Sequence, residues 1–269
     1  MAKPLIVITN DDGVKSPGLL AAAHALRGLG ELIVVAPRAQ QSSSGRAFYG
    51  GKRPALKSVV RIGRQQIRTI AVDASPAVVM RYALLLGVPR KPALVVSGIN
   101  YGENLGSGLT ISGTVGAALE AAADGVPAIA VSLETAKEFH TTHSDAIDFS
   151  IAAYWTRWMA ERILAHGLPT PASLMNMNVP STATKGTAWR LTRASQQAYF
   201  QSLVANGKFV GYDVVINDAS LEKDSDIYAV RVDQVVSVTP LTYDLTARVD
   251  FKAFAKTLTQ RLDGKPQRN

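Results

Sequence analysis

Two adjacent acids follow the first apolar run of the chain. Residues 5–9 read LIVIT, a short run of β-forming residues, and Asn10, Asp11, Asp12 and Gly13 come directly after it. Adjacent carboxylates repel each other, and both can stay charged when a cation lies between them. The pair therefore indicates a metal site, although an Asx turn with Asp12 and Gly13 forming the bend is the better explanation of an isolated NDDG.

Polar residues also follow two further apolar runs. The run 31–37 leads into a loop with serines at 42–44, and the run 93–98 is followed by Asn100 and Asn104. Ligands of an open parallel sheet bind beyond the carboxyl ends of its strands, so these groups are expected near the two aspartates. Carboxylate, hydroxyl and amide oxygens suit a hard cation. The sequence predicts a site for one divalent metal ion, Mg²⁺ or Mn²⁺.

A third polar group opens a predicted helix. Ser112, Gly113 and Thr114 precede the small-residue stretch VGAALEAAA. The free N–H groups and dipole of a helix start attract anions, and two hydroxyls add donors. Plain N-capping by Ser or Thr explains the motif equally well. An anion site beside a metal site would form a pocket for a phosphate ester.

Other motifs are weaker. His140 and His143 have an H-x-x-H spacing, but no HExxH pattern surrounds them, which favours a solvent loop over a ligand pair. The chain has no G-x-S-x-G for an acyl-transfer serine and no G-x-G-x-x-G after its first apolar run. It also lacks a Walker A lysine pattern. Acyl transfer, nicotinamide chemistry and P-loop chemistry are therefore not expected.

The elements that must position these groups alternate between strands and helices. Apolar runs of strand length lie at 5–9, 31–37, 93–98 and 128–133, with helix-like segments at 17–30, 76–86 and 115–123. This alternation predicts a doubly wound α/β fold with a mostly parallel sheet. Further expected elements are a basic hairpin within 50–72, an amphipathic helix at 147–166, a strand at 174–180, a β-rich stretch at 185–245 and a last helix near 251–262.

Composition limits the class of protein. The chain has 269 residues, no cysteine and a formal net charge of +8. No apolar run approaches the roughly 20 residues of a membrane span, and the first run is too short for a signal peptide, so a cytoplasmic location is expected. Basic residues cluster at 52–68 and 261–268 without interleaved aromatics, so dedicated nucleic-acid binding is not expected.

Taken together, the motifs resemble the survival-protein SurE family of 5′-nucleotidases. The combination of TNDDG with SGxNxGxN is highly specific, and the matches span most of the chain in the family's order. The matching segments are TNDDGVKSPG (9–18), VVAPRAQQSSSG (34–45), SGINYGENLG (97–106), SGTVGAALE (112–120), PAIAVSL (127–133), MNMNVP (175–180) and VSVTPLTYDLTA (236–247).

The resemblance implies metal-dependent hydrolysis of nucleoside 5′-monophosphates, with 3′-monophosphates and short polyphosphate as further candidate substrates. It implies a Rossmann-like three-layer sandwich in one domain, residues 1–269. Its C-terminal β-hairpin extension, within about 185–245, would be used in a homodimer or homotetramer. The family's metal ligands fall on Asp11, Asp12, Ser42 and Asn100, and its phosphate-binding positions on Asn104, Ser112, Gly113 and Thr114.

A mechanism follows from these assignments. The cation would polarise the phosphoryl group, and Asp11 or Asp12, Asp11 by preference, would orient or deprotonate the attacking water. Residues 112–114 would stabilise charge on the phosphoryl oxygens. An aspartyl-phosphate mechanism needs a second acid two residues after the nucleophile, and the adjacent acids here do not fit it.

Three departures from the family pattern leave an alternative open. The family's G-T-P-x-D-C segment reads Ala74-Ser75-Pro76-Ala77-Val78-Val79 here, without the acid and the cysteine. Gln41 replaces an arginine before the metal-binding serine, and Arg46–Tyr49 lacks the usual S-x-T. The alternatives are a nucleotide- and metal-binding regulator with reduced or lost activity and, least favoured, a structural oligomer.

Overall fold

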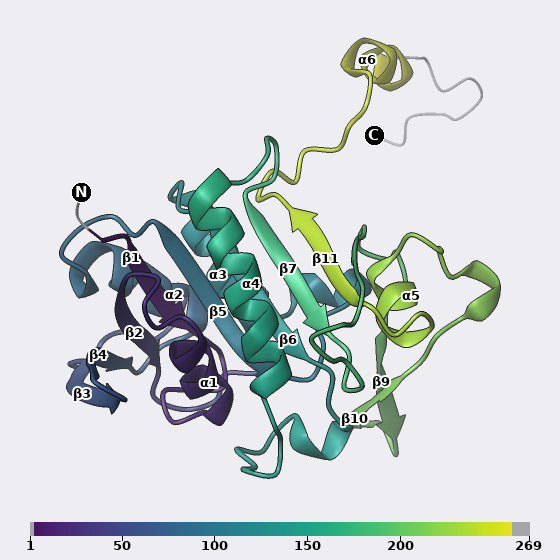
Figure 1. The fold of residues 1–269 in the computed structure, drawn as a ribbon. Helices are drawn as coiled ribbons and strands as arrows, with labels where there is room; N and C mark the ends of the chain where they lie inside the picture. Colours follow the sequence, from purple (N-terminus) through teal and green to yellow (C-terminus); the bar gives the residue numbers. More distant parts are fainter. Residues whose placement is uncertain (1–2, 260–269) are drawn as a thin grey trace.

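The computed structural model describes residues 3–259, so residues 260–262 of the expected last helix and the terminal DGKPQRN lie outside the described part. Nine strands form one sheet in the order β3-β4-β2-β1-β5-β6-β7-β11-β8, and β9 and β10 form a separate hairpin (Figure 1). The strands are β1 (Leu5–Thr9), β2 (Glu31–Pro37), β3 (Leu56–Ile62), β4 (Gln65–Val72), β5 (Leu94–Tyr101), β6 (Ala128–Leu133), β7 (Leu174–Val179), β8 (Trp189–Leu191), β9 (Phe200–Ala205), β10 (Lys208–Val214) and β11 (Val236–Leu241).

The centre of the sheet is parallel. Strands β4, β2, β1, β5, β6 and β7 pair in parallel, and four of them come from the continuous apolar runs noted in the sequence. Every residue of β1, β6 and β7 is buried, as expected for strands covered on both faces. The predicted α/β class with a mostly parallel sheet is confirmed.

Helices cover both faces and make three layers (Figure 1). The covering helices are α1 (Pro17–Ala25), α2 (Pro76–Tyr82), α3 (Gly113–Ala123) and α4 (Ser150–His166), and the chain also forms α5 (Asp226–Arg231) and α6 (Phe251–Thr259). Ile6 and Ile8 of β1 pack with α1 and α4, whereas Leu5 and Val7 pack with α2 and α3. Successive side chains of a strand point to opposite faces, so each helix pair covers its own side of the sheet.

Serines precede α1, α2 and α3, with different roles. Ser75 and Ser112 accept hydrogen bonds from the third backbone N–H after them and so cap α2 and α3. Ser16 precedes α1 and its Pro17 as predicted, but its buried hydroxyl makes no capping bond. The fixed backbone angle of Pro17 is already suited to the first helical position, so α1 begins there without a side-chain cap.

Two parts of the chain join the sheet in ways that the sequence did not indicate. The expected hairpin at 50–72 exists as the antiparallel pair β3–β4, but β4 also pairs in parallel with β2, so the hairpin extends the main sheet. Within 185–245, β11 pairs antiparallel with β7 and parallel with β8. The separate C-terminal hairpin is therefore β9–β10, which extends from one end of the body, whereas α6 extends from the opposite end (Figure 1).

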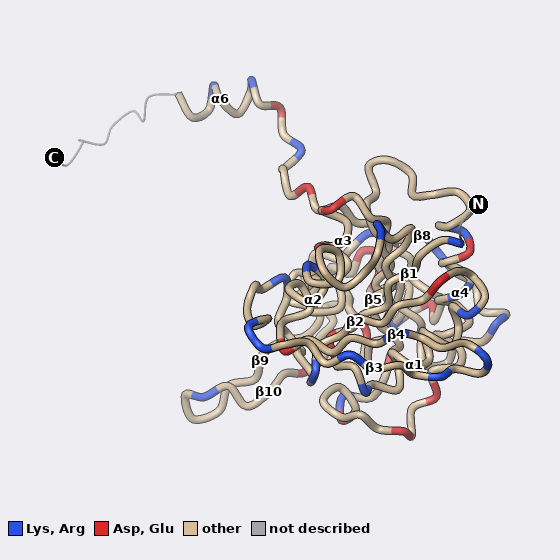
Figure 2. Tube along the Cα trace, turned by 90° about the vertical axis from the view of Figure 1, so that its left-hand side faces the viewer, with Lys and Arg blue, Asp and Glu red and all other residues tan. Residues whose placement is uncertain are grey.

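Charged residues are distributed around the body. Figure 2 shows basic segments at several places along the tube with acidic ones between them, and the β3–β4 pair carries part of the basic cluster at 52–68. Within residues 3–259, no helix has both the length and the apolar character needed to cross a bilayer.

Candidate active site

The acid pair lies at the carboxyl end of β1, next to the end of β5. The turn after β1 is held by Asn10, whose side-chain oxygen accepts the Gly13 N–H at 3.1 Å and whose amide donates to the Gly13 carbonyl at 3.0 Å. Asn10, and not an aspartate, therefore closes this turn, by bonds to the residue three positions on. The carboxylates of Asp11 and Asp12 are not used by the turn.

Asp11 faces the start of α3. Its Oδ1 accepts the Thr114 hydroxyl at 2.5 Å, and the same hydroxyl lies 3.2 Å from Asn100 Oδ1. The side-chain nitrogen of Asn100 donates to the carbonyls of Tyr101 and Gly102, at 3.0 and 2.7 Å. These bonds fix the amide so that its oxygen is directed toward Asp11 and Thr114. Three strand and helix ends are thus brought together at one point.

Asp12 is more enclosed, with 1% of its surface exposed. Gln40 Nε2 lies 3.3 Å from its Oδ1 and also donates to the His140 carbonyl at 2.8 Å. His143 Nε2 contacts the Asp12 carbonyl at 2.7 Å. The second carboxylate oxygen, Oδ2, is buried and has no hydrogen-bond partner among the described residues. A buried carboxylate oxygen without a partner calls for a counter-charge.

The electrostatics of the pair favour a cation beside it. Burial raises the pKa of Asp11. Burial, and then the negative charge of Asp11, hold the pKa of Asp12 well above its ordinary value. Two carboxyls in this position cannot both ionise cheaply unless a positive charge accompanies them. Within residues 3–259, no three His, Cys, Asp or Glu side chains gather to hold a metal, so hydroxyl and amide oxygens must complete any ligand set.

The serine loop lies against this point. The Gln41 N–H donates to the Asp11 carbonyl at 2.7 Å, and the Gly45 N–H donates to the Ile111 carbonyl at 2.9 Å. Ser42 and Ser43 line the cavity described below. Asp11, Ser42 and Asn100 thus bring carboxylate, hydroxyl and amide oxygens to one cavity, with Asp12 next to Asp11, and oxygen donors of these kinds suit a hard divalent cation.

Ser44 is a further donor that the sequence did not single out. Its hydroxyl is buried without a partner and lies beside Gly113 and Asp11. A Cβ placed on Gly113 would come within 2.8 Å of Asp11 Cβ, Asp11 Oδ2 and Ser44 Oγ. Only glycine allows the start of α3 to approach the acid pair this closely. The polar, serine-rich composition of the loop was the only signal in the sequence for Ser44.

The start of α3 is capped by Ser112, and the same segment borders the cavity. Ser112 Oγ accepts the Val115 N–H at 3.1 Å, so this hydroxyl is used in capping, while Ser112 also lines the cavity. Thr114 is fully buried and donates to Asp11. The N-terminus of the helix is therefore directed at the acid pair, where its dipole favours negative charge.

Asn104 is held in place from its backbone. Its N–H donates to Asn178 Oδ1 at 2.8 Å, and its carbonyl accepts the side-chain amides of Asn176 and Asn178, at 2.9 and 3.0 Å. Its own amide donates to Ser132 at 2.8 Å. The loop after β5 is thereby fixed to the ends of β6 and β7.

These groups border one cavity of about 380 Å³, within the roughly 300–1,000 Å³ usual for small-molecule sites. Asp11, Ser42, Asn100, Asn104 and Ser112 form a wall rich in oxygen atoms. Asp12, Gly113 and Thr114 lie behind this wall. The described residues that line the cavity include no lysine or arginine. The remaining lining residues are Ser43, Tyr101, Gly102, Glu103, Gly108, Ile111, His140, Thr141, Phe200, Ser202, Phe209, Gly211 and Tyr212.

Several of these lining residues were not predicted from the sequence. The segment with His140 and His143 was expected to be a solvent loop, but His140 lines the cavity and His143 contacts the turn of Asp12. The H-x-x-H spacing was the only sequence signal for this loop. Its two histidines contact chain segments more than 70 residues away, which the sequence does not indicate. The hairpin residues from 200 to 212 carry no local motif.

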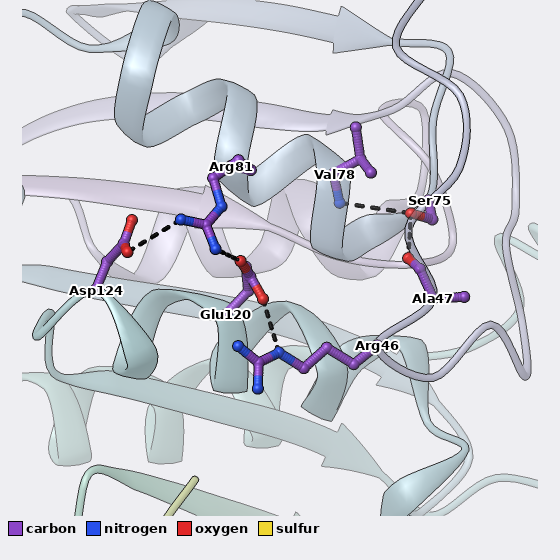
Figure 3. Close-up of polar contacts among 7 residues, drawn as sticks. All are labelled: Arg46, Ala47, Ser75, Val78, Arg81, Glu120 and Asp124. Atoms are coloured by element: carbon purple, nitrogen blue, oxygen red, sulfur yellow. Dashed lines mark hydrogen bonds and ion pairs between the residues drawn. The ribbon is translucent and has the colours of Figure 1, made fainter.

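The altered segment 74–79 lies apart from the cavity. Ser75 caps α2 and donates to the Ala47 carbonyl at 2.6 Å (Figure 3). Beside it, the buried Glu120 of α3 pairs with Arg46, at 2.7 Å, and with Arg81 of α2 (Figure 3). The departures from the family pattern at 46–49 and 74–79 therefore form a structural support behind the serine loop.

Comparison with known proteins agrees with these motifs. The model of the family described as survival protein SurE matches residues 6–201. A protein of Thermococcus gammatolerans named 5′-nucleotidase SurE is 39% identical over 261 residues, covering 94% of this chain and 95% of that protein. A protein of Thermus thermophilus named 5′-nucleotidase SurE 1 is 39% identical over 264 residues, covering 96% and 98%.

A solved structure supports the same relationship. The SurE protein from Aquifex aeolicus has a TM-score of 0.72 and 31% identity, and the match covers 95% of this chain and all of that one. The likeness that the sequence motifs indicated is therefore confirmed across the length of the chain. On the family match and the relatives at this level of identity, the chain belongs to the survival protein SurE family.

Proposed function

We propose that this chain is a phosphoric monoester hydrolase that releases phosphate from nucleoside 5′-monophosphates with the help of one divalent cation, Mg²⁺ or Mn²⁺. Nucleoside 3′-monophosphates and short polyphosphate are further candidate substrates. The proposal rests on the family, whose relatives carry the name 5′-nucleotidase. The observation that supports the chemistry most strongly is the buried acid pair beside a cavity lined with oxygen donors and without a lysine or arginine.

The charge of the cavity explains why a cation is needed. A phosphate monoester carries about −1.5 to −2 charges at neutral pH. It would enter a cavity where Asp11 and Glu103 are also acidic and where the lining supplies no cationic side chain. Asp11, Asp12, Ser42 and Asn100 would hold a divalent ion at this position. When bound, that ion supplies positive charge that polarises the phosphoryl group and lowers the pKa of a water molecule.

The protein's own groups have separate tasks in this mechanism. Asp11, fixed by its bond from Thr114, orients the attacking water and accepts its proton. The start of α3, at residues 112–114, directs its dipole and polar groups toward the phosphoryl oxygens. Asn104, fixed by Asn176, Asn178 and Ser132, positions the phosphate from the other side. Because the chain holds these groups in place before substrate binds, little reorganisation is required.

A screen for phosphate release tests this proposal. The purified chain is incubated with AMP, GMP, CMP, UMP, 3′-AMP and tripolyphosphate, each with Mg²⁺, with Mn²⁺ and with EDTA. Metal-dependent release from the 5′-monophosphates is expected, and EDTA should abolish it. Release that is equal with and without metal would contradict the mechanism.

The alternative is a nucleotide- and metal-binding regulator without turnover. It was motivated by the altered segment 74–79, which the structure places in the helix cap of α2, away from the cavity lining. This placement favours the hydrolase. Calorimetric binding of AMP in the presence of metal, with no release of phosphate over hours, would favour the regulator.

We further propose that the chain forms a homodimer or homotetramer through its C-terminal extension. Apolar side chains of the β9–β10 hairpin, within residues 185–245, support this, since Val204 and Val210 are 64% and 60% exposed. Large apolar side chains gathered on a projecting element usually mark an interface. Light scattering of the purified chain measures the assembly directly. A cytoplasmic location stays a prediction from the sequence.

A further inference from the structure

The β9–β10 hairpin presents one of its faces to the cavity. Phe200 and Ser202 alternate along β9 and therefore point to the same side. In β10, Phe209 pairs with Val204 and Tyr212 pairs with Ser202, while Val210 is passed over in the register. The face of the hairpin that carries Phe200 therefore also carries two aromatic residues of β10.

A bulge produces this arrangement. Phe209 and Tyr212 are three residues apart, a spacing that places side chains on opposite faces of a regular strand. The extra residue between Phe209 and Gly211 shifts the alternation by one, so both rings face the cavity. Gly211, with φ of 139°, accommodates the irregular backbone at low cost.

Three aromatic rings form a packed base for this wall. Phe200 meets Tyr212 edge to face, with ring centroids 5.2 Å apart. The His140 ring lies nearly parallel to that of Tyr212, and its Nδ1 is 2.8 Å from the Tyr212 hydroxyl. His140 Nε2 lies 3.2 Å from the Thr135 carbonyl, which can only accept, so Nε2 carries the proton and Nδ1 accepts from Tyr212. These contacts join the hairpin to the loop that lies against Asp12.

Phe209 differs from the other rings of this wall because it packs against no other aromatic ring within residues 3–259. It is 81% exposed and lines the cavity. Ile111, a second exposed apolar side chain at 55%, lines the same cavity from the loop before α3. The cavity thus has an oxygen-rich wall for phosphate and a second wall with unoccupied apolar surface.

We propose that Phe209 stacks on the nucleobase of the substrate, with Tyr212, Phe200 and His140 holding the hairpin in place. This inference rests on the proposed nucleotidase function and adds the part of the chain that recognises the base. The nucleobase is the flat aromatic part of a nucleotide, and it can stack on the exposed face of a phenyl ring. Stacking tolerates every base, because each base presents a π-face, so purine and pyrimidine nucleotides should differ little as substrates.

Comparison of AMP with ribose 5-phosphate tests the proposal. The two substrates share the phosphate and the ribose, and only AMP has a base. In Phe209→Ala, KM for AMP should rise about 5- to 150-fold, and kcat should change little. This factor corresponds to the free energy that is lost when an aromatic ring stacked on a base is replaced by alanine. KM for ribose 5-phosphate should stay at the parent value. Phe209→Trp should keep the parent KM for AMP.

Two controls separate stacking from disturbance of the hairpin. Leu203→Ala truncates a large apolar side chain of the same hairpin that does not line the cavity. KM for AMP and KM for ribose 5-phosphate should both stay at the parent values. Adenosine, which lacks the phosphate, should inhibit the parent competitively and inhibit Phe209→Ala more weakly by the same factor as the rise in KM for AMP.

The outcomes distinguish this inference from the function on which it rests. Equal changes for AMP and ribose 5-phosphate in Phe209→Ala, or no change for either, would overturn stacking while hydrolysis by the parent stands. Failure of the parent to release phosphate from both substrates with Mg²⁺ and with Mn²⁺ would overturn the proposed function and the inference with it.

Discussion

Replacement of Gly113 by alanine tests the packing that brings α3 to the acid pair. The new Cβ would lie 2.8 Å from Asp11 Cβ, Asp11 Oδ2 and Ser44 Oγ, which is closer than real Cβ contacts allow. Asp11 Cβ cannot move without the backbone of the turn, whereas the two oxygens belong to short side chains that can rotate. The substitution must therefore displace the carboxylate of Asp11, the backbone of α3, or both.

The magnitude follows from two opposing effects. Overpacking in a buried site costs typically about 1–3 kcal/mol. Alanine in place of glycine at a helical position returns up to about 1 kcal/mol. The net loss of stability is therefore about 0–3 kcal/mol. The activity should fall by a larger factor, since a displacement of about 1 Å of a reacting group can lower a rate about 10²-fold.

Gly108→Ala is the matched control. Gly108 lines the same cavity, and no atom lies within 4 Å of its would-be Cβ. Thermal unfolding and metal-dependent phosphate release are measured for both variants and the parent. Gly108→Ala should keep the parent's rate, whereas Gly113→Ala should lose most of it and need more metal for half-maximal activity. Equal activity of the two variants would refute the close approach on which the site depends.

Two further predictions concern the support of the site and the stability of the chain. Ser75→Ala removes the cap of α2 and the bond to Ala47, so we expect a loss of about 0.5–2 kcal/mol in unfolding free energy with kcat unchanged; a large fall in kcat would show that segment 74–79 acts in catalysis. Glu222 accepts bonds from the Ser195 hydroxyl and the Gln196 N–H, which lower the pKa of its carboxyl. A lowered folded-state pKa gives stability that is present above the unfolded value of about 4.3 and is lost as pH falls through the folded value. The Tm of Glu222→Gln should therefore fall less steeply than the Tm of the parent as the pH is lowered below about 4.3. Identical profiles of Tm against pH would contradict this.

The centre of the sheet could be predicted because short runs of sequence indicate its strands. The runs at 5–9, 31–37 and 128–133 are almost wholly apolar, and runs of this kind and length are typical of strands covered on both faces. The pairing of β4 with β2 could not be predicted, because the alternating pattern of 65–72 suits any half-exposed strand. Partner choice depends on contacts between distant segments.

The candidate site also has one part that local sequence predicts and one part that it does not. Asp11 and Asp12 follow β1 and Asn100 lies near the end of β5, and the sheet rule predicted their proximity. Ser44, His140 and the face of the β9–β10 hairpin reach the cavity through long-range packing that no local pattern records. The bulge at Val210 is an example, because a single extra residue decides which side chains face the cavity.

The most direct test of the metal-assisted mechanism is phosphate release from AMP by the parent and by Asp12→Asn, each under saturating Mn²⁺. Asparagine keeps the size of the side chain and its bond to Gln40 while it removes the charge at the buried, unpartnered Oδ2. The account predicts a rate lower by a factor on the order of 10² to 10⁴. An Asp12→Asn variant with the parent's rate at saturating metal would contradict it.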